Sequence, residues 1–116
     1  MKIRTVYQKV PDLGSAKNFW TAFLGISPSK DSPKWCEFQL ENIRFALLLN
    51  DYGDKFQGSN SVPVFELSEA EMGAKVEKAK ALGATVVLDG LADPKVQSIV
   101  LKDRQGNEFE LSKVHS

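Results

Sequence analysis

The stretch Gly106-Asn107-Glu108-Phe109-Glu110-Leu111, GNEFEL, lies near the C-terminal end of the chain and alternates apolar with acidic residues. Such alternation is typical of a β-strand that buries one of its faces. An earlier stretch, residues 42–47 (NIRFAL), has a similar pattern, with Phe45-Ala46-Leu47 where the later one has Phe109-Glu110-Leu111. The two stretches indicate that one structural unit occurs twice, and that Glu110 has an alanine as its counterpart in the first copy.

The segments before these two stretches follow the same order in both halves of the chain. Asp12 precedes apolar residues at helical spacing, and Gly25 is a typical helix stop. In the second half, Ser68 and Glu71 have the spacing of a capping box, and the helix that they begin reaches Gly83. The predicted strands are Ile3–Val10, Ile26–Lys30, Lys34–Leu40, Ile43–Asn50, Val62–Leu67, Thr85–Leu88, Val96–Lys102 and Glu108–Lys113.

The order strand, helix, strand, strand, strand therefore occurs twice, with a period of about 60 residues. Glu41-Asn42 should form a tight turn before the last strand of the first half, and the polar stretch Asp51–Ser61 should link the halves. Each half is too small to fold alone. We predict an α+β fold with two modules, about 1–50 and 62–114, in a single domain of residues 1–116. The alternation leaves open which face of Val96–Lys102 is buried.

The composition excludes several functional classes. Lys plus Arg and Asp plus Glu both number 15, so bulk electrostatics does not favour nucleic acid or an anionic membrane. No segment has the length of a signal peptide core or a membrane span, and we expect a cytoplasmic protein. The single cysteine, Cys36, lies in a strand-like run without a flanking basic residue, which predicts a buried, unreactive thiol.

Three segments together resemble the vicinal oxygen chelate superfamily, which includes glyoxalase I, extradiol dioxygenases and bleomycin-resistance proteins. They are the opening strand that runs into Val10-Pro11-Asp12-Leu13, the helix Ala16-Lys17-Asn18-Phe19-Trp20 with its end at Leu24-Gly25, and GNEFEL. The resemblance covers essentially the whole chain. It implies two βαβββ modules whose open curved sheets surround a cavity, with the helices outside, and assembly as a homodimer.

Metal-binding members of this superfamily use four His, Gln or Glu side chains from the first and last strands of the two modules. Carried over by position, the resemblance places Thr5, Ala46, Val64 and Glu110 at these sites. Catalytic zinc needs three protein ligands, and non-haem iron oxygenases need two histidines and a carboxylate. Only Glu110 is a suitable donor, and the one histidine, His115, follows the last strand. We expect no metal cofactor, no extradiol cleavage and no metal-dependent glyoxalase I reaction.

Strand alternation, with Thr5 and Ala46 facing the cavity, predicts which other side chains would line it. The predicted ligand-binding residues are Tyr7, Trp35, Glu37, Leu48, Asn50, Glu66 and Glu110, with Glu108 on the same side. Rings can stack on a flat ligand, and carboxylates can pair with a cation. Other interpretations stay open: the carboxylates could form ordinary ion pairs with Lys9 or Lys113, and the rings could lie in the core or at a dimer interface.

The favoured function is metal-independent binding of the bleomycin-resistance type, in which a homodimer sequesters a flat organic molecule, cationic antibiotics included. A second hypothesis is a metal-free isomerase or lyase that uses Glu110 or Glu66 as a general base. A third is an accessory domain whose cavity has lost its role. The expected partners are a small molecule and a second copy of the chain, with no cofactor, nucleic acid or membrane.

Overall fold

A computed structural model describes residues 2–51 and 61–114. Its elements, in chain order, are β1 (Thr5–Val10), α1 (Leu13–Leu24), β2 (Lys30–Asp31), β3 (Trp35–Gln39), β4 (Arg44–Leu49), β5 (Val64–Leu67), α2 (Glu69–Ala81), β6 (Thr85–Asp89), β7 (Ser98–Lys102) and β8 (Glu108–Lys113). Most of the predicted linker, residues 52–60, and His115 lie outside the described residues. Within those residues neither helix combines the length and the apolar character needed to cross a bilayer.

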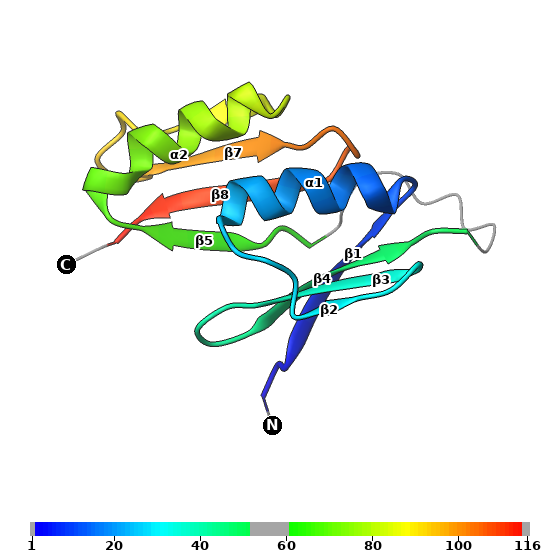
Figure 1. Ribbon diagram of the computed structural model, residues 1–116. Helices are drawn as coiled ribbons and strands as arrows, with labels where there is room; N and C mark the ends of the chain where they lie inside the picture. Colours follow the sequence, from blue (N-terminus) through cyan, green and yellow to red (C-terminus); the bar gives the residue numbers. More distant parts are fainter. Residues whose placement is uncertain (1, 52–60, 115–116) are drawn as a thin grey trace. The chain divides into compact units, whose positions relative to one another are not determined.

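The chain divides into two compact units, one on each side of residues 52–60. The strand order is β1-β4-β3-β2 in the first unit and β5-β8-β7-β6 in the second (Figure 1). In both sheets the first strand pairs in parallel with the last, and all other neighbours are antiparallel. Both sheets are open. The predicted α+β class and the two βαβββ units are thus confirmed.

Both helices begin and end where the sequence predicts. An Asp12 carboxylate oxygen accepts a hydrogen bond from the Ser15 N–H at 3.0 Å, and Gly25, with a φ of 71°, ends α1. Ser68 and Glu71 form the predicted capping box at the start of α2, and Gly83 follows this helix with a φ of 98°. These contacts satisfy backbone groups that have no partner within the helices.

In the first unit, α1 covers one face of the sheet. The ring centroids of Trp20 and Phe45 lie 4.7 Å apart, which fixes the face of β4 that meets the helix. Because strand residues alternate, the register then assigns the neighbouring side chains of β1 and β3 to the two faces. Those that are buried on the α1 side are Gln8, Val10, Cys36, Phe38, Phe45 and Leu47. The orientation predicted for β3 and β4 is therefore confirmed.

In the second unit, α2 covers one face of the sheet and contacts β8, with Met72, Val76 and Ala79 buried. The register settles the orientation that the sequence left open for Val96–Lys102. Ile99 pairs with Leu111, and Leu101 pairs with Phe109. All four side chains are buried, whereas Val100 is only partly buried and lies on the opposite face. The core of this unit therefore lies between α2 and the Ile99–Leu101 side of β7.

Of the eight strands that the structure describes, only β8 has its predicted bounds; most of the others differ by one or two residues at an end, and three of them begin beside a residue that interrupts regular pairing. β2 covers only Lys30–Asp31 instead of Ile26–Lys30, because Pro28 has no N–H to donate to a ladder. β5 begins after Pro63 for the same reason. β7 begins after Gln97, whose φ of 53° lies outside the extended region.

Two turns position the strands that carry the candidate site residues. The Leu40 N–H donates to the Ile43 carbonyl at 3.0 Å, which closes the turn predicted at Glu41-Asn42. Before GNEFEL, Asp103 Oδ1 accepts hydrogen bonds from the N–H groups of Gln105 at 2.9 Å and Asn107 at 3.0 Å. Asp103 is buried, so its carboxylate fixes how the chain enters β8.

Candidate functional site

The face of the first sheet opposite α1 brings together several of the predicted site residues. The registers arrange its side chains in three rows across β1, β4 and β3. We call this the aromatic face; its rows are Thr5–Arg44–Gln39, Tyr7–Ala46–Glu37 and Lys9–Leu48–Trp35.

Tyr7 and Trp35 meet on the aromatic face although β4 separates their strands. Their ring centroids lie 5.5 Å apart with the planes tilted by 60°, whereas strands two apart in a sheet are separated by about 9.5 Å. The rings therefore lean toward each other over β4, where Ala46 is fully buried. Tyr7 remains 49% exposed. The pair offers a ring surface on which a flat molecule can stack.

Glu37 lies on the same face and is only 5% exposed. Trp35 Nε1–H donates to Glu37 Oε1 at 3.2 Å, and Arg44 Nε lies 3.8 Å from Glu37 Oε2. A buried carboxylate is stable only with such partners. Arg44 therefore forms the ion pair with Glu37, for which the sequence offered Lys9 and Lys113. The negative charge predicted to meet a ligand is already compensated here.

Arg44 belongs to the aromatic face but is absent from the site predicted from the sequence. Alternation from Ala46 was sufficient to place it on this face. Its contacts depend on the pairing with β3, which sequence alone does not give. Arg44 Nε–H donates to Gln39 Oε1 at 3.1 Å. Lys30 of β2 pairs with Glu37, so with Lys9 and Arg44 this face carries three cations and one carboxylate.

The two remaining predicted residues of this unit differ in their surroundings. Leu48 lies between Lys9 and Trp35 in its row, next to the rings. Asn50 follows the end of β4; its N–H donates to the Val10 carbonyl at 2.8 Å, and its side-chain oxygen is buried. Asn50 therefore extends the pairing between β1 and β4.

The face of the second sheet opposite α2 carries the other predicted carboxylates, and we call it the acidic face. Its rows are Val64–Glu110–Val100–Leu88, Glu66–Ser112–Ser98 and Glu108–Lys102–Thr85. Glu110 is partly buried between Val64 and Val100, while Glu66 is exposed. Lys113 lies on the α2 side, where its Nζ is 3.9 Å from Glu69 Oε1. It is therefore not the partner of the acidic face.

The registers also revise the internal correspondence between the first strands of the two units. Tyr7 pairs with Ala46, and Val64 pairs with Glu110, the counterpart of Ala46. Val64 therefore corresponds to Tyr7, and the residue that corresponds to Thr5 is Val62. The registers thus offer Val62, beside the Val64 assigned from the sequence, as the counterpart of Thr5. Since both valines are apolar, the revision adds no metal donor.

The side chains at these positions do not fit a metal site of the superfamily type. The Thr5 hydroxyl accepts a hydrogen bond from Arg4 Nε at 3.3 Å, and Ala46 and Val62 have no donor atom. Glu110 alone provides a carboxylate, whereas a catalytic metal needs about three protein ligands. Within residues 2–51 and 61–114, no group of three His, Cys, Asp or Glu side chains is arranged to hold an ion.

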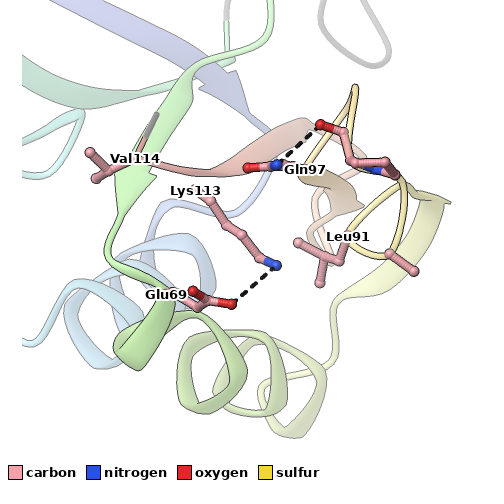
Figure 2. A pocket seen from close by; sticks show the side chains of 7 residues that line it. Glu69, Leu91, Gln97, Lys113 and Val114 are labelled. Atoms are coloured by element: carbon pink, nitrogen blue, oxygen red, sulfur yellow. Dashed lines mark hydrogen bonds and ion pairs between the residues drawn. The ribbon is translucent and has the colours of Figure 1, made fainter. Parts of the chain in front are cut away.

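A pocket of about 360 Å³ lies elsewhere in the second unit, on its α2 side. Figure 2 shows Lys113 reaching from β8 toward Glu69 of α2, and the Gln97 amide bonded to the Pro94 carbonyl at 3.0 Å. The lining residues are Glu69, Leu91, Ala92, Pro94, Gln97, Lys113 and Val114. The two charged groups of this lining face each other, and none of the predicted site residues is among them.

Cys36 lies on the α1 side and is fully buried. Burial raises the pKa of its thiol, and the nearby Asp31 carboxylate raises this pKa further. The hydrogen bond to Asp31 also raises the pKa of Lys17. Because the thiolate is the reactive form of cysteine, Cys36 is held in its inert state, as the sequence predicts.

Solved structures share this fold at low sequence identity. A glyoxalase-related enzyme from Fulvimarina pelagi has a TM-score of 0.83 at 17% identity, with 98% of this chain and 88% of that chain covered. A glyoxalase/bleomycin resistance protein from Albidiferax ferrireducens has a TM-score of 0.81 at 21% identity, with 97% and 98% covered. A mutant of the fosfomycin resistance protein FosX from Listeria monocytogenes, complexed with Mn(II) and a dihydroxypropylphosphonic acid, has a TM-score of 0.75 at 20% identity, with 97% and 88% covered. No curated protein sequence matches the chain.

The repeated βαβββ unit is thus the fold of solved structures described as glyoxalase-related, bleomycin-resistance and dioxygenase-family proteins. The sequence profile of the glyoxalase-like domain matches residues 5–112, a range that includes both units. The chain therefore belongs to the glyoxalase-like domain family. The superfamily expected from the sequence is confirmed.

Proposed function

We propose that this chain is a metal-independent binding protein that sequesters a small, flat organic molecule, in the manner of the bleomycin-resistance type. The observation that carries the proposal is the Tyr7–Trp35 ring pair, which leans over the buried Ala46 where the superfamily places a metal ligand. No covalent step is required, because a tight binding protein lowers the free concentration of a toxic molecule by mass action.

The geometry of the ring pair supports binding by stacking. Tyrosine and tryptophan provide rigid contact area with few rotatable bonds. The bond from Trp35 to Glu37 orients the indole before a ligand arrives, which reduces the entropy lost on binding. The bleomycin- and fosfomycin-resistance proteins among the similar structures support an antibiotic as the ligand class to test first.

The direct test is a tryptophan fluorescence titration in the presence of EDTA. The probes are bleomycin, other cationic antibiotics, and neutral and acidic aromatic metabolites. The chain has two tryptophans, and Trp20 is fully buried in the α1 core, so Trp35 is the indole that a ligand on the aromatic face should quench. We expect at least one probe with a Kd below about 100 μM. No such binder in the whole panel would contradict the proposal.

Three variants show whether the ligand that quenches the fluorescence binds on the aromatic face. Tyr7→Ala should weaken binding at least about tenfold, because the loss of an aromatic contact removes both stacking and buried area. Val86→Ala, which trims a 43% exposed side chain of the second sheet, is the matched control and should leave the titration unchanged. Quenching that survives Trp35→Phe with full amplitude would place the ligand away from the aromatic face.

A metal-free isomerase or lyase is the second candidate, and the surroundings of Glu110 favour it. This carboxylate is partly buried, with Val64 and Val100 as its neighbours across the sheet, as suits a general base. Glu66 is the alternative base, but it is exposed. If the chain is an enzyme, Glu110→Gln should abolish turnover of the bound probe without changing its Kd. Binding without turnover in both forms would support sequestration.

The proposal includes the homodimer and the cytoplasmic location expected from the sequence. Sedimentation equilibrium should give a mass about twice the chain mass of 12.9 kDa. A mass that stays at the monomer value up to high micromolar concentration would remove the dimer from the proposal, and the ligand titration would then report on the monomer.

A further inference from the structure

Arg44 makes its contacts on the aromatic face through Nε. The Nε–H donates to Gln39 Oε1 at 3.1 Å, and the same atom lies 3.8 Å from Glu37 Oε2. A guanidinium carries its remaining N–H donors on the two Nη atoms. Across residues 2–51 and 61–114 these Nη donors form no hydrogen bond, and the side chain is 38% exposed. The guanidinium is thus held at one end and accessible at the other.

The location of this group relative to the rings is set by the strand register. Arg44 lies in the row next to that of Tyr7, and adjacent rows on one face of a strand are about 6.6 Å apart. In an aromatic carboxylic acid, a hydrogen-bond donor that binds the carboxylate lies at a comparable distance from the centre of the ring. A ring stacked on Tyr7 could therefore present an acidic group to Arg44.

The charge balance of the face agrees with an anionic partner. Glu37 already has Trp35 Nε1–H and Arg44 beside it, and Lys30 of β2, which pairs with Glu37, adds a second cation. A guanidinium binds planar oxyanions through two parallel hydrogen bonds, which a lysine ammonium does not reproduce. A cationic ligand group would meet a face with an excess of positive charge.

We propose that Arg44 recognises the acidic group of the ligand, so that the aromatic face selects flat aromatic acids, carboxylates or phosphonates. The proposal rests on the proposed binding function and specifies its ligand class. It differs from the sequence expectation that cations are preferred, which counted Glu37 as a carboxylate available to the ligand. Arg44 could instead serve only to neutralise Glu37, and the experiment separates these two roles.

The test uses the indole N–H signals in ¹H–¹⁵N NMR spectra, because Trp35 and Trp20 give one signal each. The probes are 2-naphthoate, naphthalene-2-phosphonate, the neutral 2-naphthamide and the cationic 2-naphthylmethylamine. We expect the two acids to shift the Trp35 signal and to bind at least about tenfold more tightly than the amide and the amine, as a charge-assisted bond implies. Arg44→Lys should lose most of this preference, and Arg44→Gln should lose all of it.

Two controls exclude indirect effects. Arg4→Gln makes the same change in charge beside the same strand end and should keep the preference for acids. The double variant Glu37→Gln/Arg44→Gln removes both charges of the ion pair, so it tests recognition without leaving a buried carboxylate uncompensated. It should bind the naphthalene probes without preference for the acids.

The outcomes distinguish the inference from the function on which it rests. Equal binding of acid, amide and amine, or an acid preference that persists in the double variant, would overturn the role of Arg44 and leave flat-ligand binding intact. Tightest binding of the amine would also overturn it. A Trp35 signal that responds to none of the four probes would count against the proposed function and the inference together.

Discussion

Replacing Ala46 by glutamate restores the residue type found at the equivalent position of GNEFEL, and the structure predicts a large loss of stability. Ala46 is fully buried beneath the Tyr7–Trp35 pair, with Glu37 as its direct neighbour on β3. Directly opposed Cβ atoms lie about 5 Å apart. Two carboxylates at that separation repel by about 3 kcal/mol at an effective dielectric constant of about 20.

The matched variant Ala46→Gln has the same size without the charge. Crowding beneath the rings should destabilise both variants by about 1–3 kcal/mol, so their difference isolates the repulsion. In urea unfolding followed by circular dichroism at pH 7, we expect Ala46→Glu to be less stable than Ala46→Gln by about 3 kcal/mol. The difference should shrink toward pH 4, because one protonated carboxyl removes the repulsion.

A difference below about 1 kcal/mol at pH 7 would refute the placement of Ala46 beside Glu37, since the Coulomb estimate then fails threefold. The same variant also bears on the metal question. Thr5 and Val62 still provide no donors equivalent to histidine, so Ala46→Glu should not gain stability from added Mn²⁺ or Zn²⁺.

Substitutions at four further residues test the fold that supports the site. Gly83→Ala should destabilise the fold by about 1 kcal/mol, because Gly83 has a φ of 98°. Gly73→Ala should stabilise it by about 0.5–1 kcal/mol, because Gly73 lies in the interior of α2 and nothing lies within 4 Å of the added Cβ. Equal effects of the two variants in urea unfolding would contradict both geometries. Asp103→Ala should lower the free energy of unfolding by about 2 kcal/mol, because it removes two hydrogen bonds from backbone N–H groups to Oδ1. Asp103→Asn keeps an acceptor oxygen and should lower it less. Equal losses in the two variants would show that these hydrogen bonds do not hold the turn. Because the folded chain raises the pKa of Cys36 above its ordinary value of about 8.5, the stability from the neutral thiol is present below that pH and is lost as the pH rises through the folded pKa. Between pH 8 and pH 10 the free energy of unfolding should therefore fall less steeply in Cys36→Ala than in the native chain. In the folded native chain, Cys36 should resist iodoacetamide at pH 8, and rapid labelling would contradict its burial.

Much of the fold was predictable because local chemistry and the repeat agree. Asp12, Gly25 and the Ser68–Glu71 box mark helix ends through contacts within a few residues, and the structure has all of them. The orientation of β4 followed from alternation once Phe45 was assigned to the helix side. These features depend on short-range geometry, which the sequence records directly.

The pairing between strands was less predictable. The first strands, TVYQKV and VFEL, share too few residue types to align, and the connection to the helix has one residue fewer in the second unit. The correspondence of Thr5 with Val62 therefore became visible only in the registers of β1 with β4 and of β5 with β8. The orientation of Val96–Lys102 was hidden as well, because these seven residues place apolar and polar side chains on both faces of the strand.

The candidate site shows the same limit. Alternation placed Tyr7, Trp35 and Glu37 on one face, as the structure has them. The compensation of Glu37 by Arg44 depends on side chains that lean across rows and between strands, and no spacing along a single strand encodes it. The charge of the ligand is consequently the feature on which our proposal departs most from the sequence expectation.

The metal content of the purified protein tests the central claim most directly. After dialysis against buffer containing equimolar Mn²⁺, Ni²⁺, Zn²⁺ and Fe²⁺, and then against buffer without metal, we expect mass spectrometry to find far less than one ion per chain. The reason is that Thr5, Ala46 and Val62 leave the Glu110 carboxylate without companion ligands. One ion per chain that disappears in Glu110→Ala would contradict the account.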